Sequence, residues 1–246
     1  MSSPVVIALS DRDFDPTEVA VPWIALRQAG HEVLFATADG EPGACDADML
    51  SGVLFGAIKA TPANADRYRE MEADEAFRKP ICYRDISPTE HAALVLPGGH
   101  APGMKQYLEA SDLQAAVVAF FAANATVAAI CHGTVVLARS VDPERGKAVI
   151  EGRKLTCLPK TMEWSAWIAT VATRGNYFRT YPVWVQQEVI AAAGSRKLVS
   201  TGPLIPSYGK PYTVRDGNLL TARWPGDAER FAHELVAMLA EDAAAG

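Results

Sequence analysis

Residues 126–134 read Thr-Val-Ala-Ala-Ile-Cys-His-Gly-Thr, an apolar run that ends at a cysteine and continues directly into a helical pattern. This order predicts a buried strand joined without a linker to a helix, with Cys131 on the sharp turn between them. Such a turn, a nucleophile elbow, holds one reactive side chain at its apex. A free cysteine is more often a buried core residue, but the strand-to-helix junction and the adjacent His132 favour a nucleophile.

The position of Cys131 also predicts its acidity. Backbone N–H groups at the start of a helix favour the thiolate, so we expect the pKa of this thiol to lie below about 8.5. The other cysteines are widely spaced, and no Cys-x-x-Cys pair is present. This spacing argues against a zinc finger or a disulfide framework, so at most one cysteine should have special chemistry.

Short β-branched runs alternate with helical patterns on both sides of this stretch, which predicts βαβ units and a parallel sheet. We expect strands at 5–10, 31–37, 92–96, 126–130, 153–158 and 197–200, and a hairpin of 212–214 with 219–222. We expect helices at 15–29, 111–123, 133–140, 161–172, 182–193 and 226–241. A segment at about 46–84, with helices near 46–56 and 64–78, is longer than a simple crossover and should cap one sheet edge. The prediction is a single α/β domain over residues 1–246.

Composition excludes several classes of protein. The chain has 246 residues, 49% hydrophobic and 21% charged, which is ordinary for a globular protein and excludes a disordered one. A net charge of −6 without a basic cluster argues against nucleic-acid binding. The N-terminus lacks a basic region, and polar residues interrupt the apolar stretch 113–138, so neither a secretory signal nor a membrane span is expected. We expect a cytoplasmic protein with a small-molecule substrate.

A second glycine-rich turn, Leu96-Pro97-Gly98-Gly99-His100, follows the strand at 92–96. In a parallel sheet both turns would lie at the carboxyl edge, where ligands bind. A glycine N–H of Gly98 or Gly99 could then join the N–H of His132 in an oxyanion site, with His100 beside it. An ordinary turn is an equally good interpretation. The sequence matches neither nucleotide-binding glycine pattern, so we expect no nucleotide cofactor.

Two acidic residues are candidates for the same site. Glu18 stands three residues after Asp15, the spacing of a capping box at a helix start. A catalytic role is the alternative, because the first βα turn would also lie at the carboxyl edge, and the sequence leaves both open. Glu163 becomes interesting only as an orienting partner for His132. No local spacing supports a metal site built from Glu18, Cys131 and a histidine, so we expect no metal.

Taken together in this order, five stretches resemble the DJ-1/PfpI superfamily, and above all its Hsp31-like, class I glutamine-amidotransferase-like branch. They are Thr17–Pro22, Gly30–Val33, Phe35–Thr37, Leu96–His100 and Ala129–Gly133. The resemblance implies a flavodoxin-like α/β sandwich with a mostly parallel central sheet and helices on both faces. It also implies that Cys131 is the nucleophile and that Glu18 is a protonated acid beside it. His132 would be the base, and Glu163 would be the acid that completes the triad. The backbone of Gly99 and His132 would form the oxyanion site.

The activity implied by the resemblance is that of a cofactor-independent cysteine enzyme, acting as a homodimer on a small reactive carbonyl. Glyoxalase III-like conversion of methylglyoxal to D-lactate, without metal or glutathione, is the leading interpretation. Alternatives are a cysteine amidase, peptidase or hydratase acting on a C–N bond, and a non-enzymatic redox-sensing or holdase stress protein. The chain departs from the family pattern at 156–163 and 221–225. Both departures concern the substrate more than the fold.

Overall fold

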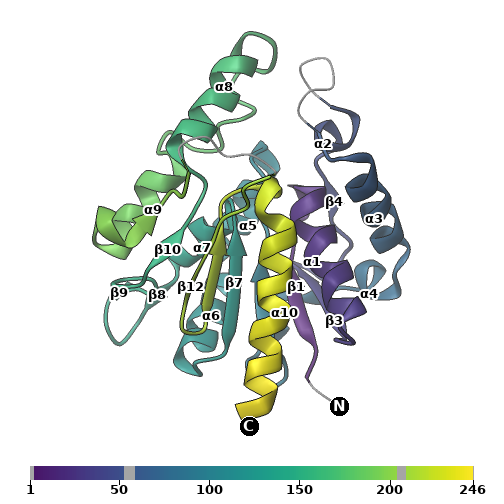
Figure 1. Ribbon diagram of the computed structural model, residues 1–246, viewed down its shortest axis with the longest axis vertical. Coiled ribbons are helices and arrows are strands. Elements are labelled where there is room, and N and C mark those ends of the chain that lie inside the picture. Colours follow the sequence, from purple (N-terminus) through teal and green to yellow (C-terminus); the bar gives the residue numbers. More distant parts are fainter. Residues whose placement is uncertain (1–2, 53–58, 204–208, 246) are drawn as a thin grey trace.

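The computed structural model describes residues 3–52, 59–203 and 209–245, and Figure 1 shows a central sheet with helices on both sides. The described residues form a seven-stranded sheet in the order β12-β13-β7-β6-β1-β3-β5. Its strands are β1 Val5–Ala8, β3 Val33–Thr37, β5 Ile81–Cys82, β6 Ala93–Leu96, β7 Thr126–Ile130, β12 Thr213–Asp216 and β13 Leu219–Ala222. Neighbouring strands run parallel except in the β12–β13 hairpin. The predicted flavodoxin-like α/β fold is therefore confirmed.

The three strands at the centre of the sheet have the composition of a buried parallel sheet. β1, β6 and β7 are apolar except for Thr126 at the start of β7, and they are buried at every position, as expected for strands that helices cover on both faces. From β1 the chain moves to β3 at one side, whereas β6 pairs with the other side of β1 and leads on to β7. The strand order therefore reverses between β1 and β6. Ligands of open α/β sheets bind at such a switch point, outside the carboxyl ends of the strands.

The reversal of the strand order between β1 and β6 also places helices on both faces of the sheet. Because parallel crossovers are right-handed, α1, which leads from β1 to β3, and α6, which leads from β6 to β7, cover opposite faces. α3 and α10 pack beside α1, and α5 and α6 contact α7. The bounds are α1 Pro16–Gln28, α3 Pro62–Ala73, α5 Lys105–Leu108, α6 Ser111–Ala122, α7 Gly133–Arg139 and α10 Ala228–Ala245. None of the helices in the described ranges is long and apolar enough to cross a membrane.

The segment at about 46–84 contributes a strand as well as helices. α2 (Ala47–Ser51) begins near the predicted position but ends before Gly52, whose φ is 95°, so the expected helix over 46–56 is shorter than predicted. Positions 53–56 lie outside the described residues. The predicted helix 64–78 is divided into α3 and α4 (Glu75–Arg78) at Asp74, whose side chain caps α4 by accepting from the Ala76 N–H at 2.8 Å. β5 then pairs with β3 and becomes an edge strand of the sheet. Upstream, β2 (Arg12–Phe14) and β4 (Ala44–Cys45) form a small parallel ribbon.

Between β7 and the hairpin the chain leaves the sheet. Figure 1 shows α8 (Lys160–Arg174) extending past the sheet, across from α2. The predicted strand 153–158 is reduced to β10 (Leu155–Thr156), which pairs with β11 (Val199–Ser200) instead of joining the main sheet. The remaining elements are β8 Val141–Asp142, β9 Lys147–Ala148 and α9 Val185–Ala193.

Candidate active site

Cys131 occupies a strained turn directly after β7. Its φ angle is 57°, in the left-handed region that costs a residue with a side chain about 1–3 kcal/mol. Two residues later the chain passes very close to the end of β6. A Cβ at Gly133 would lie 2.0 Å from the Leu96 carbonyl oxygen. Glycine is therefore required there, and the predicted sharp strand-to-helix turn is present.

Three turns, after β1, β6 and β7, meet at the switch point. The Gly98 N–H donates to Glu18 Oε2 at 2.8 Å. A Cβ on Gly98 would lie 2.8 Å from that oxygen and 2.9 Å from the Cβ of Cys131, so glycine is required here too. Asp15 caps α1 by accepting from the backbone of Thr17 and Glu18, at 2.8 and 3.1 Å. The capping box is only half correct, because the Asp15 N–H donates to the Gly98 carbonyl and not to Glu18.

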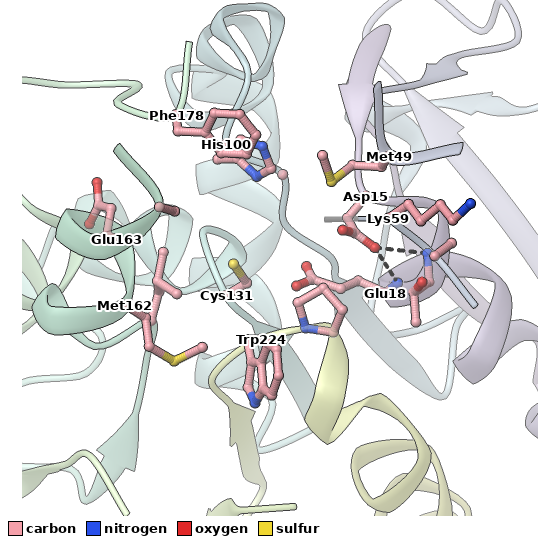
Figure 2. Close-up of a pocket in the computed structure, with 16 residues that line it drawn as sticks. Asp15, Glu18, Met49, Lys59, His100, Cys131, Met162, Glu163, Phe178 and Trp224 are labelled. Carbon is pink, nitrogen blue, oxygen red and sulfur yellow. Dashed lines mark hydrogen bonds between the residues drawn. The ribbon is translucent and has the colours of Figure 1, made fainter. Parts of the chain in front are cut away.

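Glu18 holds a proton in this environment. Its side chain is fully buried, and burial together with the neighbouring Asp15 raises the pKa of Glu18 well above its usual value. Oε1 has no hydrogen-bond partner in the part of the chain that the structure describes. Figure 2 shows the carboxyl group pointing toward the sulfur of Cys131. A protonated Glu18 is thus positioned to donate a hydrogen bond toward this sulfur or toward an atom bonded to it.

Cys131 differs from the sequence-based expectation in its acidity. Burial raises the pKa of the thiol well above its usual value, negative charge on Glu18 or Asp15 raises it further when either group ionises, and a backbone hydrogen bond from His132 only partly offsets this. The expected lowering of this pKa is therefore wrong. The start of α7 lies two residues away, but desolvation of the thiolate is the larger effect. At rest Cys131 is therefore a thiol, and it would need a base to act as a nucleophile.

His132 is the candidate base beside Cys131, and a hydrogen-bond chain fixes its tautomer. Its Nδ1 lies 3.5 Å from Cys131 Sγ and its Nε2 lies 3.4 Å from Thr180 Oγ1. The Thr180 hydroxyl has one proton, which it donates to the His100 carbonyl at 2.7 Å, so toward His132 it can only accept. Nε2 therefore carries the proton, and the bare Nδ1 faces the thiol. Burial, together with His100, lowers the pKa of His132 to about 3, which keeps the imidazole neutral.

Glu163 does not hold the position expected of a triad acid. Its Oε2 accepts from the Val185 N–H at 3.0 Å, and Gln186 Oε1 accepts from the Lys160 N–H at 2.9 Å. α8 and α9 thus satisfy each other's first N–H groups. Among the described residues, the partner of His132 Nε2 is Thr180, which sequence reasoning missed. No local motif marks Thr180, which stands 48 positions from His132.

The residues of the glycine-rich turn, which were all predicted to line an oxyanion site, differ in their hydrogen bonds. The N–H of Gly98 is already donated to Glu18, so it is not free for an oxyanion. Gly99 lines the cavity, and its N–H has no acceptor within the described ranges. The ring of His100 stacks on Phe178 with centroids 4.1 Å apart, and its Nε2 lies 3.8 Å from Asp46 Oδ2. Burial lowers the pKa of His100 to about 4, so the ring is a neutral part of the wall.

These groups surround a cavity of about 240 Å³ (Figure 2). Its floor is Glu18, Gly99 and Cys131, and its outer wall is Leu158, Met162, Glu163, Phe178 and Trp224. Figure 2 shows Glu18 and Glu163 on opposite sides of the space. His132 is fully buried behind Cys131 and is not one of the described lining residues. The described residues contain no group of three or more potential ligands that could hold a metal ion.

Comparison with known proteins shows the family to which the chain belongs. Residues 9–201 match the family model described as ThiJ/PfpI family-like. The chain belongs to this family. It is 24% identical to glyoxalase 3 of Candida albicans over 220 residues, which are 89% of this chain and 86% of that protein. It is 23% identical to the deglycase PfpI of Pyrococcus furiosus over 236 residues, which are 95% and 98% of the two chains.

Solved structures of family members share the fold. Candida albicans glyoxalase III superposes with a TM-score of 0.71 at 21% identity, covering 96% of both chains. The rapid encystment protein of Francisella tularensis has a TM-score of 0.72 at 18% identity, covering 97% of this chain and 99% of that one. Drosophila melanogaster DJ-1beta has a TM-score of 0.59 at 20% identity, covering 97% and 90%. The predicted membership of the DJ-1/PfpI superfamily is confirmed.

Proposed function

We propose that this protein is a cofactor-independent cysteine enzyme that converts a 2-oxoaldehyde and water to a 2-hydroxy acid, as in the conversion of methylglyoxal to D-lactate. One observation carries the proposal: the bare Nδ1 of a neutral His132 lies 3.5 Å from Cys131 Sγ, with the protonated Glu18 on the cavity side. The glyoxalase names of its relatives support the same reaction class.

In the first step, the Cys131 sulfur bonds to the aldehyde carbon while the thiol proton moves to Nδ1 of His132. The carbonyl oxygen takes the proton of Glu18, which gives a neutral hemithioacetal and leaves Glu18 as a carboxylate. The site that starts without charge now holds an imidazolium and a carboxylate on either side of the new bond. Gly99 offers a free N–H to the oxygen on the neighbouring carbon.

In the second step, the Glu18 carboxylate removes the hydrogen of the former aldehyde carbon and returns it to the neighbouring carbon, while the hydroxyl proton passes to the second oxygen. The product is a thioester of a 2-hydroxy acid. Glu18 takes this role because it lines the cavity, whereas His132 lies behind the sulfur. Water then attacks the thioester, its proton returns to Glu18, and the imidazolium returns its proton to Cys131.

Burial disfavours the redox-sensor alternative. Cys131 is 5% exposed and its thiol pKa is raised, whereas sulfur oxidation favours exposed, low-pKa cysteines. Cys45 and Cys82 are both more exposed. Burial raises the pKa of Cys45 to about 12 as well, so oxidation by mild peroxide should reach Cys82 before Cys131.

The decisive test is D-lactate formation from methylglyoxal by the wild type, Cys131→Ala and the control variant Cys82→Ala. We expect the Cys131 variant to lose activity by about 1,000-fold or more, because no nucleophile remains. Cys82→Ala should retain the wild-type rate, since Cys82 lies on the edge strand β5. Equal rates for wild type and Cys131→Ala, or no product from either, would overturn the proposal.

A further inference from the structure

The cavity is larger and more apolar than a two- or three-carbon aldehyde requires. Resting on the proposed function, we propose that its substrates are 2-oxoaldehydes whose substituent is a bulky apolar group, of about the size of an aromatic ring. Phenylglyoxal represents this class, and methylglyoxal is its small counterpart.

The volume and the surface of the cavity support this assignment. An apolar cavity of about 150 Å³ is enough to hold a benzene molecule, and this one measures about 240 Å³. Apart from Glu163, its outer wall presents a leucine, a methionine, a phenylalanine and a tryptophan, and Met49 faces them across the space. Such a wall favours an apolar substituent by the area it removes from water.

Some of the carboxyl groups around the cavity bind the backbone of the protein itself. Asp15 caps α1, Glu18 accepts from Gly98, and Glu163 accepts from Val185. Nε2 of His100 lies 3.8 Å from Asp46 Oδ2, and neither atom has a hydrogen-bond partner among the described residues. The outer wall presents the apolar side chains of Leu158, Met162 and Phe178, and burying a hydroxyl group against them without a hydrogen bond is costly.

Charge points the same way. Lys59 is the one cation among the described lining residues, and it is exposed to solvent. Among the described residues, no cation inside the cavity could therefore pair with a phosphate or carboxylate group on the substituent. The carboxyl groups of Asp15, Glu18 and Glu163 would repel such a tail whenever they ionise. The substituent should be uncharged as well as apolar.

The wall also contains both places where the sequence departs from the family pattern. Leu158 and Met162 lie in the 156–163 stretch, and Trp224 lies in the 221–225 stretch. These stretches are far apart in the chain, but they meet on one side of the cavity (Figure 2). Their convergence indicates a chain-specific pocket wall opposite Glu18.

The test compares kcat/KM for phenylglyoxal and methylglyoxal in the wild type, Met162→Gln and the control Trp164→Gln. We expect a preference for phenylglyoxal of about 10-fold or more in the wild type, from burial of the ring. Met162→Gln places an amide on the wall and should lower this preference several-fold. Trp164 is 48% exposed and lies outside the described lining, so its variant should keep the preference. Equal or better use of methylglyoxal by the wild type would overturn the inference.

A second measurement separates this inference from the proposed reaction. Acetophenone and acetone lack the reactive aldehyde, so they report binding without turnover. We expect acetophenone to slow the alkylation of Cys131 by iodoacetamide at lower concentrations than acetone. If neither aldehyde is turned over but acetophenone protects better, the reaction is wrong and the pocket preference stands. If acetone protects equally well, the preference is wrong.

Discussion

The floor and the outer wall of the cavity are built from different parts of the chain. The floor comes from the turns after three neighbouring strands of the parallel sheet, and its side chains are fixed by close backbone contacts. The outer wall comes mainly from α8, the segment before α9 and the residues after β13. The central sheet therefore positions the chemistry, and peripheral segments shape the space that a substrate occupies.

The floor and the outer wall each contain one buried glutamate, and the two can be compared directly. Glu18 and Glu163 are both buried, both have a raised pKa, and each accepts a hydrogen bond from one backbone N–H. Glu18 lies beside the nucleophile, whereas Glu163 joins two helices. Perturbed acidity marks a candidate site, but the partners of the group decide its role.

The largest expected effect is on the floor. Glu18→Gln should lower kcat/KM by about 100- to 1,000-fold, because an amide cannot carry protons between the substrate atoms. Its oxygen can still accept from the Gly98 N–H. The variant should therefore stay folded, and Cys131 should still react with iodoacetamide. Wild-type activity in this variant would remove Glu18 from the reaction.

A smaller effect is expected at Thr180, behind the floor. Thr180→Val keeps the side-chain shape but removes the acceptor for His132 Nε2–H, so the tautomer is no longer fixed. We expect kcat/KM to fall by about 10- to 100-fold, as for other partners that orient a histidine. The pH dependence of Cys131 alkylation should also change. Thr180→Ser should restore both properties, and a serine variant no better than the valine variant would contradict the tautomer assignment.

The smallest effect on activity is expected on the wall. Glu163→Gln should change kcat/KM by less than about 3-fold, because the amide still accepts from the Val185 N–H. A loss comparable to that of Glu18→Gln would instead restore Glu163 as the triad acid.

Ionisation of Glu163 should make the free energy of unfolding depend on pH. Burial raises its pKa from 4.5 to about 7, so the folded protein binds this proton more tightly than the unfolded chain. The stabilising contribution of the proton is complete below pH 4.5 and is lost as the pH rises to about 7. Relative to Glu163→Gln, the wild type should lose roughly 3 kcal/mol of unfolding free energy over this range. Urea unfolding of both proteins at several pH values measures the difference, and parallel pH curves would contradict it.

Much of the fold could be predicted from local patterns. The apolar runs of β1, β6 and β7 indicated buried parallel strands, and the structure places all three at the centre of the sheet. The Asp-Pro start of α1 and the hairpin turn were equally clear. The edge strand β5 was not predicted, because a two-residue strand has no periodicity of its own. Strands were predicted at 153–158 and 197–200, but local patterns do not show that β10 and β11 pair with each other outside the main sheet.

The sequence by itself determined the elbow at Cys131, the neighbouring His132 and the glycines that let the turns meet, because each depends on backbone sterics within a few residues. Only the tertiary structure decided that Thr180 pairs with His132, that Glu163 caps α9 and that the pKa of Cys131 rises. The first two depend on how α8, α9 and their connection dock beside the sheet, and the third depends on burial of the thiol beside Glu18 and Asp15. Burial and long-range partners set them, and neither is encoded in local spacing.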